Sequence, residues 1–378
     1  MSLRPARRLE GIERTLIRRI FDAAPPGAIN LGLGQPDLPT PPPMALAGVS
    51  AIVEGRTGYT STAGDPELRA AVAERYPGVA SGADNVVITV GSQEGIFLAC
   101  LAMLDSGSEM LYPEPGYPAY PMVARLVGAK PVPYPLRADG GFSLRAEDIE
   151  RRLTLRTGAV ILSAPSNPTG AGHKTPELER LLSVLRSRNV PWISDEVYAA
   201  ITYDDRGASP GEISPEGGLV ISGLSKEMSM TGWRVGWVVG PQAILSRIVA
   251  AQQYIVTCAS SVSQRAALAA FTSEGRAYGK RYLARLLERR SLMALELSEI
   301  PNVRFAVPHG GFYFFADVSA YGSALETARR ILERANVITI PGPAFGAGAE
   351  GYLRLSFAAS EQDIVHGVRR IRRELTGP

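Results

Sequence analysis

Short apolar runs alternate with longer amphipathic stretches through the middle of the chain, and this alternation restricts the possible folds most. Residues 86–90, 159–165 and 218–225 have the length and composition of buried strands. Residues 93–104 and 177–188 have the length and periodicity of helices. Strands that are apolar along their whole length are typical of a sheet with both faces covered. The pattern therefore predicts an α/β fold with a mainly parallel sheet between helices.

The C-terminal part of the chain shows a different pattern. Residues 310–319 and 352–358 resemble half-exposed strands, and a helical stretch at residues 325–335 lies between them. A chain of 378 residues is long for one compact core and suits two domains. We therefore expect a smaller α+β domain beside the larger one.

Composition and charge exclude several classes of protein. Apolar residues make up 45% of the chain and charged residues 20%, which is the balance of an ordinary globular protein. The net charge is only +3, and no basic run is dense enough to indicate a nucleic-acid surface. The locally basic segment 4–20 is interpreted as a solvated amphipathic helix. No window reaches the roughly 18 apolar residues of a membrane span, and no apolar signal core is visible, so we expect a cytoplasmic protein.

The cysteines and histidines predict neither a disulfide nor a metal site. Cys100 and Cys258 lie far apart in apolar surroundings, and we interpret both as buried thiols in a reducing compartment. His173, His309 and His366 are scattered without the spacing of metal ligands. We therefore expect no metal.

Polar side chains follow several of the predicted strands at the points where those strands end. Ser92 and Gln93 open a helix after one strand, Asn167 follows a second, and Asp195 and Lys226 follow two more. In open α/β sheets, ligands bind beyond the carboxyl ends of the strands. We therefore expect these side chains to converge on one cleft.

Lys226 and Asp195 each have a chemical and a structural interpretation. Lys226 lies among small, polar and apolar residues in the segment 222–236 (SGLSKEMSMTGWRVG). A lysine shielded from water has a lowered pKa and can attack a carbonyl, although a lysine that reaches water from a loop is the plainer alternative. Asp195 ends an apolar run, where a carboxylate needs a cationic partner. That partner could be a protonated pyridine nitrogen or a structural arginine or lysine.

The remaining polar candidates are also ambiguous when taken singly. Arg234, Ser225 and the amides of Ser92 and Gln93 could form a phosphate cradle at a helix N-terminus, although a lone serine there is more often an N-cap. Arg354 lies in an apolar strand, where a carboxylate from the protein or from a substrate would offset its burial. Four more residues could contact a ligand or could serve only in turns and packing: Asn167, Tyr198, Tyr117 and Tyr59.

The order of these motifs resembles one known family. The segment 222–236 fits the lysine signature of that family, and SNPTG at 166–170 and SDEVY at 194–198 precede it in the expected order. The likeness extends from LGLGQPDLPTP near the start of the chain to YLRLSFA near its end. The chain resembles the class I and II aminotransferases, which are pyridoxal 5′-phosphate (PLP) enzymes of fold type I.

The resemblance implies three catalytic residues and a substrate contact. Lys226 would hold PLP as a Schiff base and, once released, would move a proton. Asp195 would keep the pyridine nitrogen of the cofactor protonated, and Tyr198 would hydrogen-bond its phenolic oxygen. The substrate α-carboxylate would be bound by Arg354 with help from Gly34 and Asn167.

The resemblance also assigns the rest of the cofactor site. Tyr117 would stack on the ring, and Tyr59 would reach the cofactor phosphate of a neighbouring subunit, which implies a homodimer with shared active sites. Gly223 stands where many relatives have a serine, and Gln93 stands where several aspartate-using relatives have a lysine. The other cofactor contacts would come from Ser92, Gln93, Asn167, Ser225 and Arg234.

The fold implied by the resemblance has two domains. The larger domain, residues 46–284, would contain a mainly parallel seven-stranded sheet covered by helices. The smaller α+β domain would be formed by both chain ends, residues 1–45 and 285–378. Side-chain recognition would lie around residues 12–21, Leu33 and Tyr117 and a loop of the partner subunit, where apolar residues suit aromatic, methionine-like or branched donors.

The implied reaction is transfer of the amino group of an L-amino acid to a 2-oxo acid, with 2-oxoglutarate as the expected acceptor, by a ping-pong mechanism. The main alternative is a PLP-dependent C–S β-lyase or a related eliminase. Some lyase-like relatives have DEIH where this chain has DEVY, which favours transamination. An effector domain of a transcription regulator fits less well, since the small-domain pattern begins within about thirty residues and leaves no room for a helix-turn-helix module. A Rossmann protein also fits less well, since no G-x-G-x-x-G follows a first strand.

Overall fold

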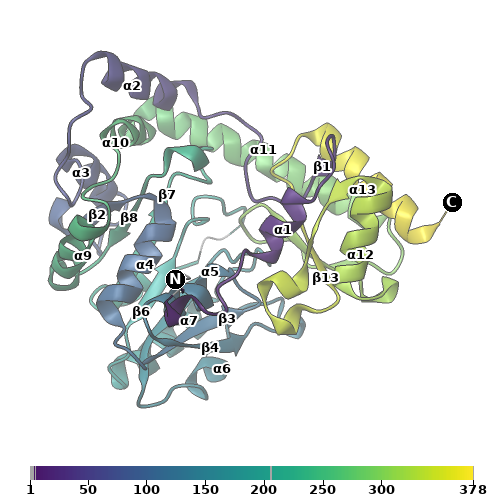
Figure 1. The fold of residues 1–378 in the computed structure, drawn as a ribbon, viewed down its shortest axis with the longest axis horizontal. Helices are drawn as coiled ribbons and strands as arrows, with labels where there is room; N and C mark the ends of the chain where they lie inside the picture. The colour runs from purple at the N-terminus through teal and green to yellow at the C-terminus, as the bar shows by residue number, and fades with distance from the viewer. Residues whose placement is uncertain (1–3, 5, 205–206, 378) are drawn as a thin grey trace.

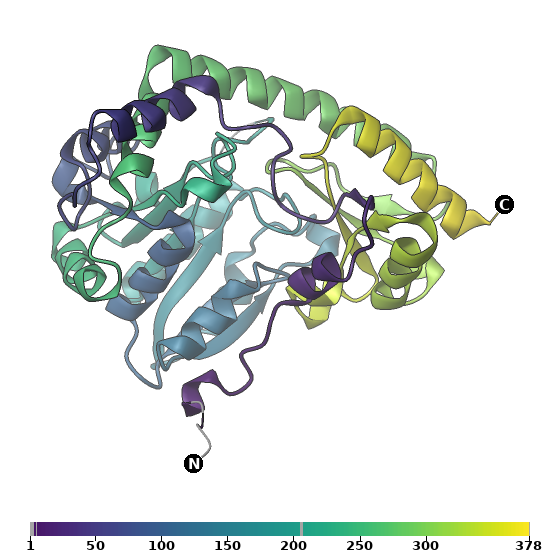
Figure 2. The same cartoon turned by 45° about the horizontal axis from the view of Figure 1, so that its top comes forward.

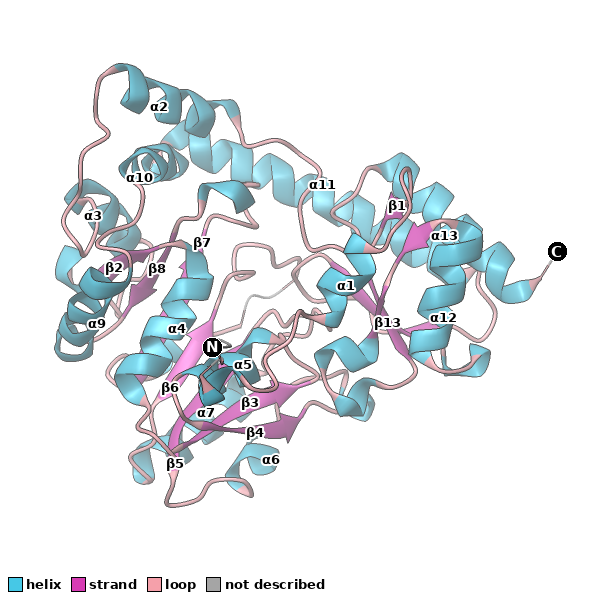
Figure 3. Cartoon of the chain, in the orientation of Figure 1, coloured by secondary structure: helices cyan, strands magenta, loops and turns pink. Residues whose placement is uncertain are grey.

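A seven-stranded sheet forms the centre of the larger part of the molecule (Figures 1 and 3). The computed structural model describes residues 4, 6–204 and 207–377. Within these residues, β8 (Gly236–Val239) runs antiparallel to both neighbours, and the other neighbouring pairs of this sheet are parallel. The predicted mainly parallel sheet is therefore confirmed. In spatial order its strands are β2 (Val86–Thr89), β8, β7 (Gly218–Gly223), β6 (Trp192–Asp195), β5 (Thr157–Ser163), β3 (Glu109–Glu114) and β4 (Lys130–Pro135).

Both faces of this sheet are buried, which explains why its strands are apolar along their whole length. Along β5, Val160 and Leu162 point into one apolar cluster, and Ala159 and Ile161 point into another. The second cluster contains residues of α4 (Gly91–Met103), α5 (Ala119–Leu126) and α9 (Gln242–Ile255). The first contains residues of α3 (Pro66–Glu74), α6 (Ala146–Glu150), α7 (Thr175–Ser187) and α10 (Ser261–Leu268).

Several helices begin at a residue whose side chain accepts a hydrogen bond from the first turn. Asp65 accepts hydrogen bonds from the backbone N–H groups of Glu67 and Leu68 at the start of α3. Ser360 accepts one from the N–H of Asp363 in the same way. The other helices in the described chain are α1 (Leu16–Asp22), α2 (Pro42–Val53), α8 (Pro210–Ile213), α11 (Ser273–Ser298), α12 (Ala324–Arg330) and α13 (Glu361–Thr376).

A smaller antiparallel sheet lies at the other end of the molecule, and its two central strands are more buried than the sequence suggested. In the described chain its order is β12 (Ile340–Pro341), β13 (Tyr352–Ser356), β10 (Tyr313–Asp317) and β9 (Arg304–Phe305). The prediction of half-exposed strands is wrong for β10 and β13, because both faces are covered. Phe314 packs with the cluster of α11 and α13, whereas Phe315 packs against Phe142 from the larger part.

The long helix α11 connects the two parts (Figure 2), and α13 packs alongside it. Arg289 of α11 is fully buried and donates to both carboxylate oxygens of Asp37 and to Glu361 at the start of α13. A short parallel pair, β1 (Ile29–Asn30) with β11 (Val337–Ile338), brings the two ends of the chain together. We keep the division into residues 46–284 and the two chain ends as a proposal, in which the second boundary falls inside α11.

The N-terminal segment differs from the expected single amphipathic helix. A 3₁₀ turn at Arg7–Leu9 and the seven-residue α1 are separated by a non-helical stretch, in which Gly11 has a φ of +75°. Glycine adopts this left-handed conformation without a steric cost, and it interrupts the helix. Pro5, within the predicted helix, lies outside the described residues.

The two cysteines are unpaired. Cys100 is buried in α4, but Cys258 is only half-buried because it lies in the loop between α9 and α10, which corrects the expectation for that residue. Among the described helices, none has both the length and the apolar character needed to span a membrane. No cluster of His, Cys, Asp and Glu suited to a metal ion occurs in the described part of the chain.

Candidate active site

A pocket of about 360 Å³ lies beyond the carboxyl ends of β5, β6 and β7 and beside the first turn of α4. We call it the front pocket. Its position is the one at which open α/β sheets bind ligands. Of the residues singled out from the sequence, it is lined by Gly34, Ser92, Gln93, Tyr117, Asn167, Asp195, Tyr198, Ser225, Lys226, Arg234 and Arg354.

Lys226 follows β7 and extends its amine into the front pocket, where Nζ donates a hydrogen bond to the carbonyl oxygen of Gly34 at 2.7 Å. Burial, together with the nearby Arg354 and Arg234, lowers the pKa of Lys226 to about 8, and Asp195 opposes this shift. Much of this lysine is therefore a neutral amine near pH 8. Gly34 has no room for a side chain, because a Cβ atom would lie 1.8 Å from the Tyr313 hydroxyl.

Asp195 is the last residue of β6 and is buried. Its Oδ2 accepts a hydrogen bond from the Tyr120 hydroxyl at 2.7 Å, and its Oδ1 accepts one from the Val197 N–H at 3.2 Å. Burial raises the pKa of this carboxyl, while the two hydrogen bonds and Lys226 lower it. No arginine, lysine or histidine among the described residues lies within ion-pair distance, so the structure provides no cation to balance a buried carboxylate.

Arg354 presents the opposite case, a buried cation with no anion. Its Nη1 donates to Asn167 Oδ1 at 2.8 Å, and its Nη2 donates to the carbonyl oxygen of Gly32 at 2.6 Å. The guanidinium lies 4.2 Å from the centre of the Tyr313 ring and 4.7 Å from that of Phe345. Nε is buried without a hydrogen-bond partner, and burial lowers the pKa of the group. Because only neutral groups contact it in the described chain, a carboxylate from a ligand would complete its surroundings.

Arg234 and the first turn of α4 form a positively charged corner of the pocket. Arg234 has a φ of +53° and donates to the carbonyl oxygens of Thr231 and Val90 at 3.0 and 3.3 Å. Gly91, with a φ of +74°, lets this guanidinium approach, since a Cβ atom would lie 2.4 Å from Nη2. Free N–H groups at a helix start and an adjacent arginine suit a phosphate. Ser92 and Ser225 line the same corner.

The tyrosines of the pocket are linked by hydrogen bonds. Tyr117 donates to Gln93 Oε1 at 3.0 Å, and the hydroxyls of Tyr198 and Tyr313 lie 3.0 Å apart. Burial raises the pKa of Tyr198 well above its ordinary value, so this residue stays a neutral phenol. The departure at Gly223 has a steric reason: a Cβ atom there would lie 2.9 Å from the backbone of Gly236.

The front pocket contains residues that the sequence analysis did not identify, and one predicted residue, Tyr59, does not line it. Tyr120 lies on α5, which begins two residues after Tyr117, and its nearness in the chain to Tyr117 could have indicated it. Tyr313 reaches the pocket from β10 of the smaller sheet, and nothing local in the sequence indicates it. Arg18 also lines the pocket, and it pairs with Asp22 at 3.0 Å. Tyr59 does not line the pocket and is 90% exposed.

The charges of the front pocket fit PLP. Asp195 is a buried carboxylate without a cation, and Lys226, Arg234 and Arg354 form no ion pair within the described residues. A phosphate, a ring nitrogen that can be protonated and a substrate carboxylate would satisfy these groups together. Few small ligands carry this combination of charges.

Comparisons with known proteins identify the family. The family model for aminotransferase class I and II matches residues 26–371. The chain is 33% identical to an aspartate aminotransferase of Pyrococcus horikoshii over 98% of this chain and 97% of that protein. It is 37% identical to a probable aspartate/prephenate aminotransferase of Aquifex aeolicus over 92% of this chain and 91% of that protein.

A solved structure shows the same fold. The aspartate aminotransferase tetra mutant of Thermus thermophilus complexed with tryptophan superposes with a TM-score of 0.95 at 30% identity, covering 99% of this chain and all of that one. The match includes the seven-stranded sheet, the smaller sheet and both chain ends, because it extends over nearly the whole chain. The chain therefore belongs to the class I and II aminotransferases and is an aminotransferase.

Proposed function

We propose that this aminotransferase uses PLP to move the amino group of an L-amino acid to a 2-oxo acid, with 2-oxoglutarate as the main acceptor, in a ping-pong reaction. One observation carries the proposal. The front pocket brings together a lysine whose pKa is lowered to about 8, a buried carboxylate without a cation, and a buried arginine without an anion. These are the groups needed to bind an aldehyde cofactor and an amino acid side by side.

The residues that would hold the cofactor surround the pocket. Asp195 would pair with the ring nitrogen, Tyr117 would lie against the ring, and Asn167 and Tyr198 would hydrogen-bond its phenolic oxygen. When bound, PLP supplies an aldehyde that condenses with amines and a ring that withdraws electrons from the carbon that loses a proton. The phosphate would be held by Ser92, Gln93, Ser225 and Arg234.

Lys226 is the proposed base. Its lowered pKa lets the neutral amine accept a proton near physiological pH, which is where a general base works best. The Gly34 carbonyl holds the amine in the pocket. Arg354 would bind the α-carboxylate of the substrate in the same pocket, with Asn167 and the ring of Tyr313 fixing the guanidinium. The residues thus orient the substrate and place the base beside it.

Substrate range follows from the part of the pocket to which α1, α4 and the loop after β1 contribute. Ile17, Leu33 and Ile96 are apolar, whereas Arg18 brings a positive charge to the same pocket. Such a mixture suits apolar or aromatic donors and also acidic ones, and we propose a broad donor range. The names of the relatives, which include aspartate and prephenate, support this range.

A homodimer is part of the proposal. Helix α2 exposes apolar side chains at helical spacing, and such a stripe on a surface marks an interface. Tyr59, which follows this helix, is exposed and could reach a partner's active site. The exposed residues of α2 are Leu46, Val49, Ile52 and Val53. We also keep the cytoplasm as the proposed location.

The test is the absorbance of the PLP-loaded protein before and after addition of single L-amino acids. Transamination predicts that the visible band of the lysine-bound cofactor shifts for preferred donors and returns when 2-oxoglutarate is added. A persistent band with accumulation of ammonia and a 2-oxo acid would instead establish the β-lyase. No band after addition of PLP would contradict the proposal as a whole.

A further inference from the structure

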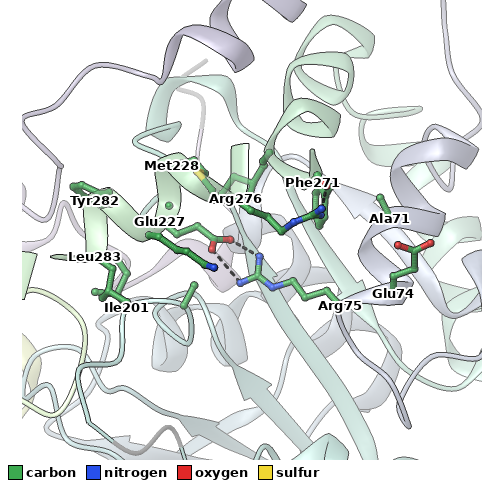
Figure 4. Close-up of a pocket in the computed structure, with 15 residues that line it drawn as sticks. Ala71, Glu74, Arg75, Ile201, Glu227, Met228, Phe271, Arg276, Tyr282 and Leu283 are labelled. Carbon is green, nitrogen blue, oxygen red and sulfur yellow. Dashed lines mark hydrogen bonds and ion pairs between the residues drawn. The ribbon is translucent and has the colours of Figure 1, made fainter. Parts of the chain in front are cut away.

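A second cavity adjoins the residues that follow Lys226, and Figure 4 draws the side chains that line it. We call it the rear cavity. Its volume is about 450 Å³, which exceeds that of the front pocket, and the two share no lining residue. Glu227 and Met228, the two residues after Lys226, line it, and so do Ala200 and Ile201, which follow Tyr198 closely in the chain. The rear cavity therefore adjoins two segments that also serve the front pocket.

The inner charges of the rear cavity are balanced. Arg75 Nη1 and Nη2 donate to the two carboxylate oxygens of Glu227 at 2.5 and 3.1 Å, as the dashed lines in Figure 4 show. Glu227 is buried and Arg75 is half-buried. A bidentate pair of this kind satisfies both groups, so it requires no ligand. A ligand in the cavity must therefore be recognised by other residues.

The walls of the rear cavity are apolar, and one of them lacks a side chain. Met228, Phe271 and Leu283 line the cavity from three segments. Gly279 lies on the face of α11 that lines the cavity, and within 4 Å of its ideal Cβ position the described residues place only Met228 Cε, at 3.0 Å. The Met228 methyl group therefore occupies the position that a side chain at residue 279 would take. The cavity between these apolar walls, of about 450 Å³, is suited to an apolar group.

Two cations at the rim lack acidic partners. Arg276 and Lys280 are exposed, lie one turn apart on α11 and both line the cavity. Arg276 donates to the carbonyl oxygen of Phe271, and neither side chain forms an ion pair within the described chain. Like charges at this spacing repel each other, and an anion between them would remove that repulsion. Because the charges of Arg75 and Glu227 cancel, Glu74 is the one remaining acidic residue among those that line the cavity, against the two positive charges of Arg276 and Lys280.

We propose that the rear cavity is a second binding site, for a small carboxylate that carries an apolar body. Arg276 and Lys280 would bind the carboxylate, and the apolar body would lie among Met228, Phe271 and Leu283. Because Met228 and Glu227 belong to the same segment as Lys226, occupancy of the rear cavity would alter the affinity of the front pocket for its cofactor. The binding site goes beyond the proposed function, and its first test does not depend on that function.

The first test measures binding of 3-phenylpropionate by isothermal titration calorimetry. The front pocket is silenced by Arg354→Ala, so that only the rear cavity can bind the probe. We expect one site per chain in this variant, at least tenfold weaker binding when Arg276→Gln and Lys280→Gln are added, and loss of binding with Ala71→Leu, which places a larger side chain in the cavity. Arg281→Gln on the same helix is the matched control and should leave the affinity unchanged, because Arg281 does not line the cavity.

Three outcomes would overturn the binding site. These are loss of all binding on Arg354→Ala alone, equal affinity in the Arg276→Gln/Lys280→Gln variant, and equal affinity for 2-phenylethylamine, which has the same apolar body without a carboxylate. Because glutamine replacements of exposed residues preserve the fold, a loss of binding in them reports on the charges. The leucine replacement puts a strong helix former at a half-buried position of α3 and should also leave the protein folded.

The second test measures the link between the two sites. In the Arg354→Ala protein, the dissociation constant for PLP is determined from absorbance with and without saturating 3-phenylpropionate. Linkage requires that each ligand change the affinity of the other by the same factor, and we expect a change of about fivefold. Equal PLP affinities would overturn the link. Failure of PLP to bind under both conditions would instead count against the proposed function, because probe binding is measured separately.

Discussion

The front pocket and the rear cavity lie next to the same short segment, Leu224–Met228. They differ in whether their buried charged groups have ion-pair partners. In the front pocket, Lys226, Asp195 and Arg354 have no ion-pair partner within the described chain. In the rear cavity, Arg75 and Glu227 satisfy each other through two hydrogen bonds. A buried charge without a partner lowers the stability of the fold, and pairing it with an opposite charge offsets part of that loss. The segment thus has a side suited to chemistry and a side that holds it in place.

The largest effect is expected from removing the amine of Lys226 in the front pocket. Lys226→Ala should abolish turnover, by at least about 10⁴-fold, because both the amine that binds the cofactor and the base are lost. Initial rates with the best donor, and the visible band after addition of PLP, measure the loss. Lys130→Ala, at an exposed position of β4 that lines neither pocket, is the matched control and should retain its turnover. Retained transamination in Lys226→Ala would exclude this lysine from the mechanism.

Asp195→Ala should lower kcat by roughly 10²–10³-fold, since the charge that stabilises the electron-withdrawing form of the ring is removed. Tyr120→Phe is the milder variant: it keeps Asp195 and removes the hydroxyl that donates to Asp195 and also hydrogen-bonds Ser163, so it should lower kcat by less than tenfold. Circular dichroism checks that both variants are folded. Turnover like that of the unmodified protein in Asp195→Ala would show that this carboxylate is structural.

Arg354→Ala should raise the KM for amino acids and 2-oxo acids by about 10–100-fold, because each loses the partner of its carboxylate. It should also change a pH profile. Arg354 lowers the pKa of Lys226, so its removal should move the midpoint of PLP capture, which needs the neutral amine, from about 8 to higher pH. The capture rate measured against pH tests the shift. An unchanged midpoint together with an unchanged KM would remove Arg354 from the site.

The smallest effect on catalysis is expected at the rear. Arg75→Ala leaves the buried Glu227 without a cation and should lower the free energy of unfolding by about 3 kcal/mol, with kcat changed only a few-fold. Urea unfolding and initial rates measure the two quantities. The double variant Arg75→Met with Glu227→Leu should regain most of the stability, since no unpaired charge remains. If Arg75→Ala lowered kcat as much as Lys226→Ala does, the Arg75–Glu227 pair would be needed for catalysis and not only for stability.

The sequence indicated the front pocket well where its residues follow strands. Asp195, Asn167 and Lys226 come directly after apolar runs, and parallel strands end at the same edge of a sheet, so local pattern alone brings them together. Burial of the smaller sheet was predicted less well. Residues 310–319 resembled a half-exposed strand, but Phe315 packs against Phe142 of the larger part. A contact with a separate part of the chain cannot be inferred from the strand itself.

Three features could be predicted from the sequence: the order of strands and helices, the polar residues at the strand ends, and the family signature. Each is encoded by short segments whose residues are close together in the chain. How the charges are satisfied depends instead on the tertiary structure. Arg354 and Asn167 are 187 positions apart, and Tyr198 and Tyr313 are 115 apart, yet each pair is hydrogen-bonded. The rear cavity likewise forms only where α3, α11 and residues 224–228 come together. The pKa of a buried group depends on everything within a few ångströms, and that neighbourhood exists only in the folded chain.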